Sequence, residues 1–115
     1  MHVYDWNTMA EERLNPMVTR RVVHTERMTI AKLRLSKGAI VPLHHHENEQ
    51  ISTIDEGALR FEMPGRDIIV RAGESLVIPS NVPHLVEALE DSIATDLFTP
   101  PRQDWISGDD AYLRR

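Results

Sequence analysis

Residues 38–57 read GAIVPLHHHENEQISTIDEG, with apolar residues on both sides of three consecutive histidines. β-Branched and alternating apolar residues of this kind predict two short strands, Ile40–His46 and Gln50–Ile54, joined by a tight turn. The sequence Asp55-Glu56-Gly57 then favours a turn that ends the second strand. The histidines are therefore expected on and beside β-strands, and not on a helix.

The strand pattern continues through most of the chain, with turn residues roughly every 8 to 12 positions. About nine short strands of this spacing are typical of an all-β sandwich or barrel, and a jelly-roll β-barrel hides their edges. One short N-terminal helix is expected over Asp5–Leu14, with Asn7 or Thr8 as its cap and Pro16 just beyond its end. The other predicted strands are Met17–His24, Met28–Ser36, Ala58–Met63, Asp67–Arg71, Ser75–Ile78, His84–Leu89 and Ile93–Phe98.

Composition limits the classes of function. The 115 residues predict one domain, 1–115. The 13 Lys+Arg against 18 Asp+Glu form no basic block, which argues against nucleic-acid binding. With no cysteine, a metal must be held by nitrogen and oxygen ligands. No apolar run is long enough to span a membrane, and residues 1–12 do not resemble a signal peptide, so a cytoplasmic location is expected.

The histidine cluster has the spacing of a chelating pair. On a strand, alternate residues share a face, so His44 and His46 point to one side and His45 to the other. Gln50 starts the next predicted strand and His84 a later one, so these four side chains can converge inside a barrel if their strands pack closely. The competing interpretation is an ordinary surface or core histidine pair. His45, Glu47 and Glu49 are expected at the rim.

Two segments resemble the paired motifs of the cupin family. Gly38 is followed by His44, His46, Gln50 and Gly57 in the order of the first motif, and Gly73, Pro79, Asn81 and His84 follow the second. The resemblance covers about residues 28–105 and implies one divalent metal on His44, His46, Gln50 and His84. Asn81 replaces a glycine, which is tolerable because asparagine also adopts left-handed conformations. Ala88 replaces a closing asparagine that is not a ligand.

Gln50 is the most informative departure, because most cupins have a glutamate ligand there. Glu49 is one residue early, and both the spacing and the strand parity favour Gln50. A neutral amide oxygen leaves the ion its full double charge, which favours Lewis-acid chemistry over oxygen activation. Nitrogen and oxygen ligands accept nickel, zinc, iron, manganese or cobalt.

The stretch DLFTPPRQDW, residues 96–105, is similar to the C-terminal part of cupins that open unsaturated uronate rings during pectin and alginate degradation (KdgF type). The resemblance implies roles for Asp96 in proton transfer, for Phe98 in packing on the sugar and for Arg102 in anchoring its carboxylate. Strand parity places Asp96 and Phe98 on one face. Ser52, two residues after Gln50, is a weaker candidate for substrate binding. The alternative is that Asp96 and Arg102 pair with each other and tie down the tail.

The resemblance predicts a metal-dependent enzyme that converts 4,5-unsaturated monouronates to linear keto-deoxyuronates. Two alternatives stay open: an iron-dependent dioxygenase and a non-catalytic cupin that binds a small ligand. The expected partner is a small acidic sugar or another small molecule. A homodimer is also expected from the family, with the N-terminal segment up to His24 as a candidate contact.

Overall fold

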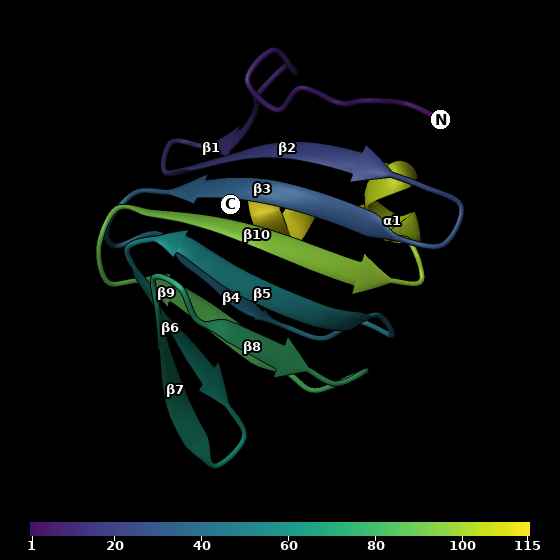
Figure 1. Cartoon of the computed structure of the whole chain (residues 1–115). Helices are drawn as coiled ribbons and strands as arrows, with labels where there is room; N and C mark the ends of the chain where they lie inside the picture. Colours follow the sequence, from purple (N-terminus) through teal and green to yellow (C-terminus); the bar gives the residue numbers. More distant parts are fainter.

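The computed structural model describes residues 1–115, in which ten strands form two antiparallel sheets that face each other across a common core (Figure 1). The six-stranded sheet has the order β1-β2-β3-β10-β5-β8, and the four-stranded sheet has the order β4-β9-β6-β7. The predicted all-β jelly-roll architecture is confirmed. The strands are β1 Glu12–Asn15, β2 Val18–His24, β3 Thr29–Leu35, β4 Ile40–His44, β5 Glu49–Glu56, β6 Ala58–Met63, β7 Arg66–Arg71, β8 Ser75–Ile78, β9 His84–Ala88 and β10 Ser92–Thr99.

Alternating residues of the strands build the core between the sheets. In β3, Ala31, Leu33 and Leu35 are buried, while Lys32 and Arg34 lie on the outer face. The same period buries Leu59 and Phe61 of β6. Because inward residues at one end of this core are polar, the same alternation that forms the core also places a polar site inside the barrel.

Register brings residues far apart in the sequence to this site. Strand β10 lies between β3 and β5, and it pairs Asp96 with Ser52 and Phe98 with Gln50. In the other sheet, β4 pairs with β9 so that His44 lies opposite His84. The two sheets therefore carry the predicted site residues on facing inner surfaces.

Two turns depend on left-handed backbone conformations. Gly57, between β5 and β6, has a φ of +86°, and a Cβ there would lie 2.3 Å from Ser92 Oγ and 2.5 Å from the carbonyl oxygen of Asp91. Only glycine fits both the conformation and the space. Asn81 has a φ of +64°, so the substitution of asparagine for the usual motif glycine is accommodated as expected.

The predicted N-terminal helix over Asp5–Leu14 is wrong. Asp5 closes a single turn by accepting hydrogen bonds from the backbone N–H groups of Thr8 and Met9, both at 3.1 Å. The chain then enters β1, which pairs with β2 and buries Leu14. Pairing with a neighbouring strand therefore outweighs the local helix signal, and β1 is the strand missing from the predicted nine.

The only helices lie near the other end of the chain, behind the large sheet in the view of Figure 1: α1, Gln103–Ile106, and the 3-10 helix η1, Ala111–Arg114. Trp105 of α1 and Leu113 of η1 are buried in the core. The side chain of Asn15 in β1 donates to the carbonyl oxygen of Leu113 at 3.0 Å. Neither helix has the length or hydropathy needed to cross a membrane.

Candidate active site

Three histidines converge between the sheets. His44 ends β4, His46 lies in the loop that follows, and His84 begins β9. One ring nitrogen from each lies within 4.8 Å of the others. Ring centroids are 4.2 Å apart for His44 and His84, and 5.3 Å apart for His46 and His84. By contrast, His45 is exposed, as strand parity predicts.

Each ring of this triad is oriented by a backbone carbonyl two residues away. A carbonyl oxygen accepts from Nδ1, which fixes the hydrogen on that nitrogen and leaves Nε2 free as a ligand. Orientation by a second group of this kind is typical of metal-binding histidines. The bonds are His44 Nδ1 to Pro42 at 2.7 Å, His46 Nδ1 to Asn48 at 3.0 Å and His84 Nδ1 to Val82 at 2.9 Å.

Gln50 completes this donor set. Its side chain is buried, and its Nε2 donates to Ser52 Oγ at 2.8 Å. Its Oε1 therefore faces His46 Nε2, at 3.0 Å. Since the hydrogen of His46 is on Nδ1, two lone pairs face each other, an arrangement that a shared cation satisfies. Glu49, the alternative oxygen ligand, is exposed at the start of β5.

Burial keeps the triad neutral. Burial lowers the pKa of His44 to about 3, helped by the neighbouring His84, and lowers that of His46 to about 4, helped by the positive charge of Arg102. The pKa of His84 is also lowered, again mainly by burial. Metal binding requires neutral imidazole, so the unprotonated rings, the carbonyl bonds and the Gln50 oxygen together fit one divalent ion.

Asp96 is the carboxylate of the site. It lies in the middle of β10, opposite Ser52, and its Oδ1 is buried without a hydrogen-bond partner. Burial raises the pKa of Asp96 to about 6, although Ser52 and Arg102 oppose the shift. A buried acid with an unpaired oxygen and a pKa near neutrality is typical of a functional site.

Arg102 is held in place by the tail of the chain. Its side chain is 1% exposed, and it binds Asp104 through Nε at 3.0 Å and Nη2 at 2.8 Å. Its guanidinium also stacks on Phe98 and Trp105, at 4.8 and 4.3 Å from the ring centroids. The alternative in which Arg102 pairs with Asp96 is therefore wrong, since the carboxylate of Asp104, two residues along, is closer.

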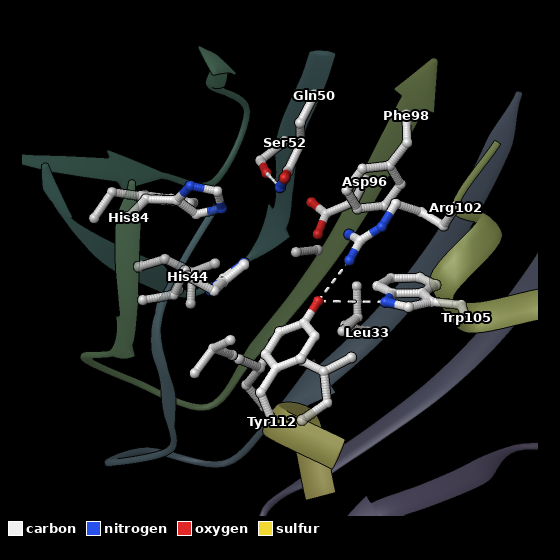
Figure 2. Close-up of a pocket in the computed structure, with 17 residues that line it drawn as sticks. Leu33, His44, Gln50, Ser52, His84, Asp96, Phe98, Arg102, Trp105 and Tyr112 are labelled. Carbon is white, nitrogen blue, oxygen red and sulfur yellow. Dashed lines mark hydrogen bonds between the residues drawn. The ribbon is translucent and has the colours of Figure 1, made fainter. Parts of the chain in front are cut away.

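The predicted residues surround one cavity of about 40 Å³ (Figure 2). His46 flanks it through its contacts with His84 and Gln50. Apart from apolar core residues, the cavity wall also contains Trp105 and Tyr112, which carry hydrogen-bonding groups and to which sequence reasoning gave no role in the site. No motif indicates Tyr112, and Trp105 is indistinguishable in sequence from a packing residue. The predicted residues in the wall are His44, Gln50, Ser52, His84, Asp96, Phe98 and Arg102.

The family model described as Cupin domain matches residues 31–99, which include every candidate ligand. The chain belongs to the cupin family. A search of curated proteins found no match to this cupin.

Solved structures agree with that assignment. The structure of KdgF from Halomonas sp. is 28% identical, covers 90% of this cupin and 99% of its own chain, and has a TM-score of 0.84. A Bacillus subtilis oxalate decarboxylase mutant is 26% identical, with 84% of this cupin and 28% of that chain covered and a TM-score of 0.71. A RmlC-like cupin from Shewanella frigidimarina, 24% identical over 91% of this cupin and 96% of its own chain, shares the fold with a TM-score of 0.85.

Proposed function

We propose that this cupin opens the ring of 4,5-unsaturated monouronates and forms linear keto-deoxyuronates. The observation that supports this proposal is the gathering, around one cavity, of every residue that the KdgF-type resemblance implies. The likeness to Halomonas KdgF extends over 90% of this cupin and 99% of that chain.

The proposed ligands of one divalent ion are His44, His46, His84 and Gln50. The ion would be nickel, zinc, iron, manganese or cobalt, since the site offers only nitrogen and neutral oxygen donors. When bound, it supplies Lewis-acid polarisation of a substrate oxygen. The protein contributes the fixed orientation of the three rings and the amide, which are already held by carbonyls and by Ser52.

Asp96 is the proposed proton carrier. Its unpaired Oδ1 is available to take or give a proton, and a pKa of about 6 makes both forms accessible near neutral pH. The neighbouring Ser52, which accepts from Gln50, would bind a substrate hydroxyl beside this carboxyl group. Asp96 and Ser52 share the inner face of the large sheet, opposite the histidines.

Phe98 and Arg102 are the proposed substrate anchors. The Phe98 ring lies between the triad and the guanidinium, 5.7 Å from the His46 ring, and offers an apolar surface to a sugar ring. Arg102 would bind the uronate carboxylate through parallel hydrogen bonds. Burial of this arginine strengthens the attraction because water is excluded.

Product analysis tests the proposal. Metal-loaded protein is mixed with the unsaturated monouronates released by pectate and alginate lyases, and the linear keto product is followed by NMR. We expect its formation to exceed the spontaneous reaction and to stop with chelator or with His84→Ala. Oxygen consumption instead of ring opening would favour the dioxygenase, and binding without reaction would favour the ligand-binding cupin.

The proposal includes the assembly and the location of the protein. We expect a homodimer in the cytoplasm that acts on a small acidic sugar. β1 and β2 already pair within the chain's own sheet, which leaves Met1–Tyr4 exposed and available to a partner. Light scattering of the full chain measures the dimer directly, and a monomer at micromolar concentration would exclude it.

A further inference from the structure

The hydroxyl group of Tyr112 lies in the site beside two hydrogen-bond donors. Its hydroxyl oxygen accepts hydrogen bonds from Arg102 Nη2 at 2.6 Å and from Trp105 Nε1 at 3.3 Å. Its ring lies against His44, with centroids 4.8 Å apart. Figure 2 shows this hydroxyl beside the guanidinium and the indole, on the cavity side of both. A tyrosine side chain thus bridges the proposed metal ligands and the proposed anion anchor.

The space that Tyr112 leaves in the cavity is small. The cavity volume of about 40 Å³ accommodates about three water molecules. Arg102 is fully buried, and its contacts with Asp104 and Tyr112 already use Nε and Nη2. A carboxylate oxygen can therefore bind Nη2 and the Trp105 indole together only after the Tyr112 hydroxyl has moved.

The segment that carries Tyr112 is held on both sides, since Leu113 is buried in the core and its carbonyl oxygen accepts from Asn15 at 3.0 Å. The 3-10 helix η1 has only four residues. Its ion pairs join Arg114 to Glu12, at 2.7 Å, and to Asp110, at 3.0 Å, and the Arg114 and Glu12 side chains are 39% and 44% exposed. Exposed pairs of this kind contribute little to stability. The stronger anchors are buried, namely Leu113 and the contact of Asp110 with Arg20 at 3.0 Å, so the part left free to move is the Tyr112 side chain and not η1 as a whole.

We propose that Arg102 Nη2 and Trp105 Nε1 form a binding subsite for a carboxylate oxygen, which the Tyr112 hydroxyl fills until a ligand displaces the Tyr112 side chain. The ligand class is a small carboxylate with a ring that can replace the Tyr112 ring against His44. This inference rests on the proposed function only in taking Arg102 as the carboxylate anchor. Trp105 thereby becomes a ligand-binding residue, and Tyr112 a competitor for its site.

The first test removes the competing hydroxyl. D-Galacturonate is titrated calorimetrically into metal-loaded wild type and Tyr112→Phe, which keeps the ring and loses only the oxygen. We expect the variant to bind roughly tenfold more tightly, because loss of the hydroxyl destabilises the state in which Tyr112 occupies the subsite. Tyr4→Phe, at the only other tyrosine, is exposed and should bind as wild type does. Unchanged or weaker binding by Tyr112→Phe overturns the proposal.

The second test addresses the indole donor. In the Tyr112→Phe background, the Trp105 indole N–H has a partner only when the ligand is bound. Trp105→Phe removes this donor, so binding should weaken severalfold. Trp6→Phe, at the only other tryptophan, is the matched control and should have no effect. A circular dichroism spectrum of each variant confirms that it is folded. Equal binding with and without the Trp105 indole would show that Trp105 is not part of the subsite.

Turnover of unsaturated monouronates separates this inference from the proposed function. If wild type turns over the substrate but Tyr112→Phe does not bind D-galacturonate more tightly, the proposed function is supported and the displacement of Tyr112 is wrong. If Tyr112→Phe binds D-galacturonate more tightly but wild type shows no turnover, the subsite is supported and the proposed reaction is wrong. If neither is observed, both are wrong.

Discussion

The amide oxygen of Gln50 lies 3.0 Å from Nε2 of His46, so two hydrogen-bond acceptors face each other in a buried site. The orientation is enforced from both sides. Asn48 accepts from Nδ1 of His46, and Ser52 accepts from the amide nitrogen of Gln50. Such a contact is unfavourable unless a cation lies between the lone pairs, which makes it the clearest structural indication of the metal centre.

Metal content should depend on the triad and not on its exposed neighbour. His84→Ala removes one of three nitrogen ligands, and we expect the affinity for a divalent ion to fall by more than about 100-fold. His45→Ala, one residue from two of the ligands, should retain the ion because its side chain points to solvent. Elemental analysis after dialysis gives the comparison, and equal loss in both variants would contradict the assignment.

Asp96→Asn should separate metal binding from reaction. The amide has nearly the shape of the carboxyl group but cannot carry the proton, so we expect turnover of unsaturated monouronates to fall by about 100-fold or more. Metal content should be unchanged, since Asp96 is not among the ligands. A loss of metal in this variant would mean that the role of Asp96 has been misassigned.

Stability should depend on pH through the same residue. Burial raises the pKa of Asp96 from 3.8 to about 6, so the folded protein loses stability as pH rises through this interval, by up to about 3 kcal/mol. Asp96→Asn lacks this loss, so the difference between its free energy of unfolding and that of wild type should grow between pH 4 and pH 7. Urea unfolding of chelated protein measures the difference. Asp109→Asn, at an exposed turn, is the control for the loss of a carboxylate that is not buried.

Gly57 and Gly65 offer a matched pair for the turn geometry. Both have positive φ, at +86° and +80°, but a Cβ at Gly65 would meet nothing within 4 Å. Gly65→Ala should therefore cost only the conformational penalty of roughly 1–2 kcal/mol. Gly57→Ala adds a clash with Ser92 and the Asp91 carbonyl, and should cost about 2 kcal/mol more. Equal losses on denaturant unfolding would contradict the close approach.

Sequence alone predicted the parts of the molecule that depend on short periods. Strand parity placed His44 with His46 and Asp96 with Phe98, because alternation is a local property of an extended chain. The convergence of Gln50 and His84 with them required the family resemblance, since it depends on which strands face each other. In the structure, ring nitrogens of the three histidines lie within 4.8 Å of one another, and Gln50 lines the same cavity as His44 and His84.

The features that sequence did not predict depend on contacts between distant segments. Strand β1 forms by pairing with β2, where local signals favoured a helix. The choice of Asp104 over Asp96 as the partner of Arg102 depends on how the tail turns into α1. Tyr112 reaches the site only because η1 folds back against β1, a contact with no local signature.

Ring opening is measured by the rate at which metal-loaded protein consumes an unsaturated monouronate, followed as the loss of its ultraviolet absorbance. We expect a rate well above the spontaneous reaction, abolished by a chelator and restored when the divalent ion is added back. A rate equal to the spontaneous reaction, with the metal site fully occupied, would contradict the proposed function.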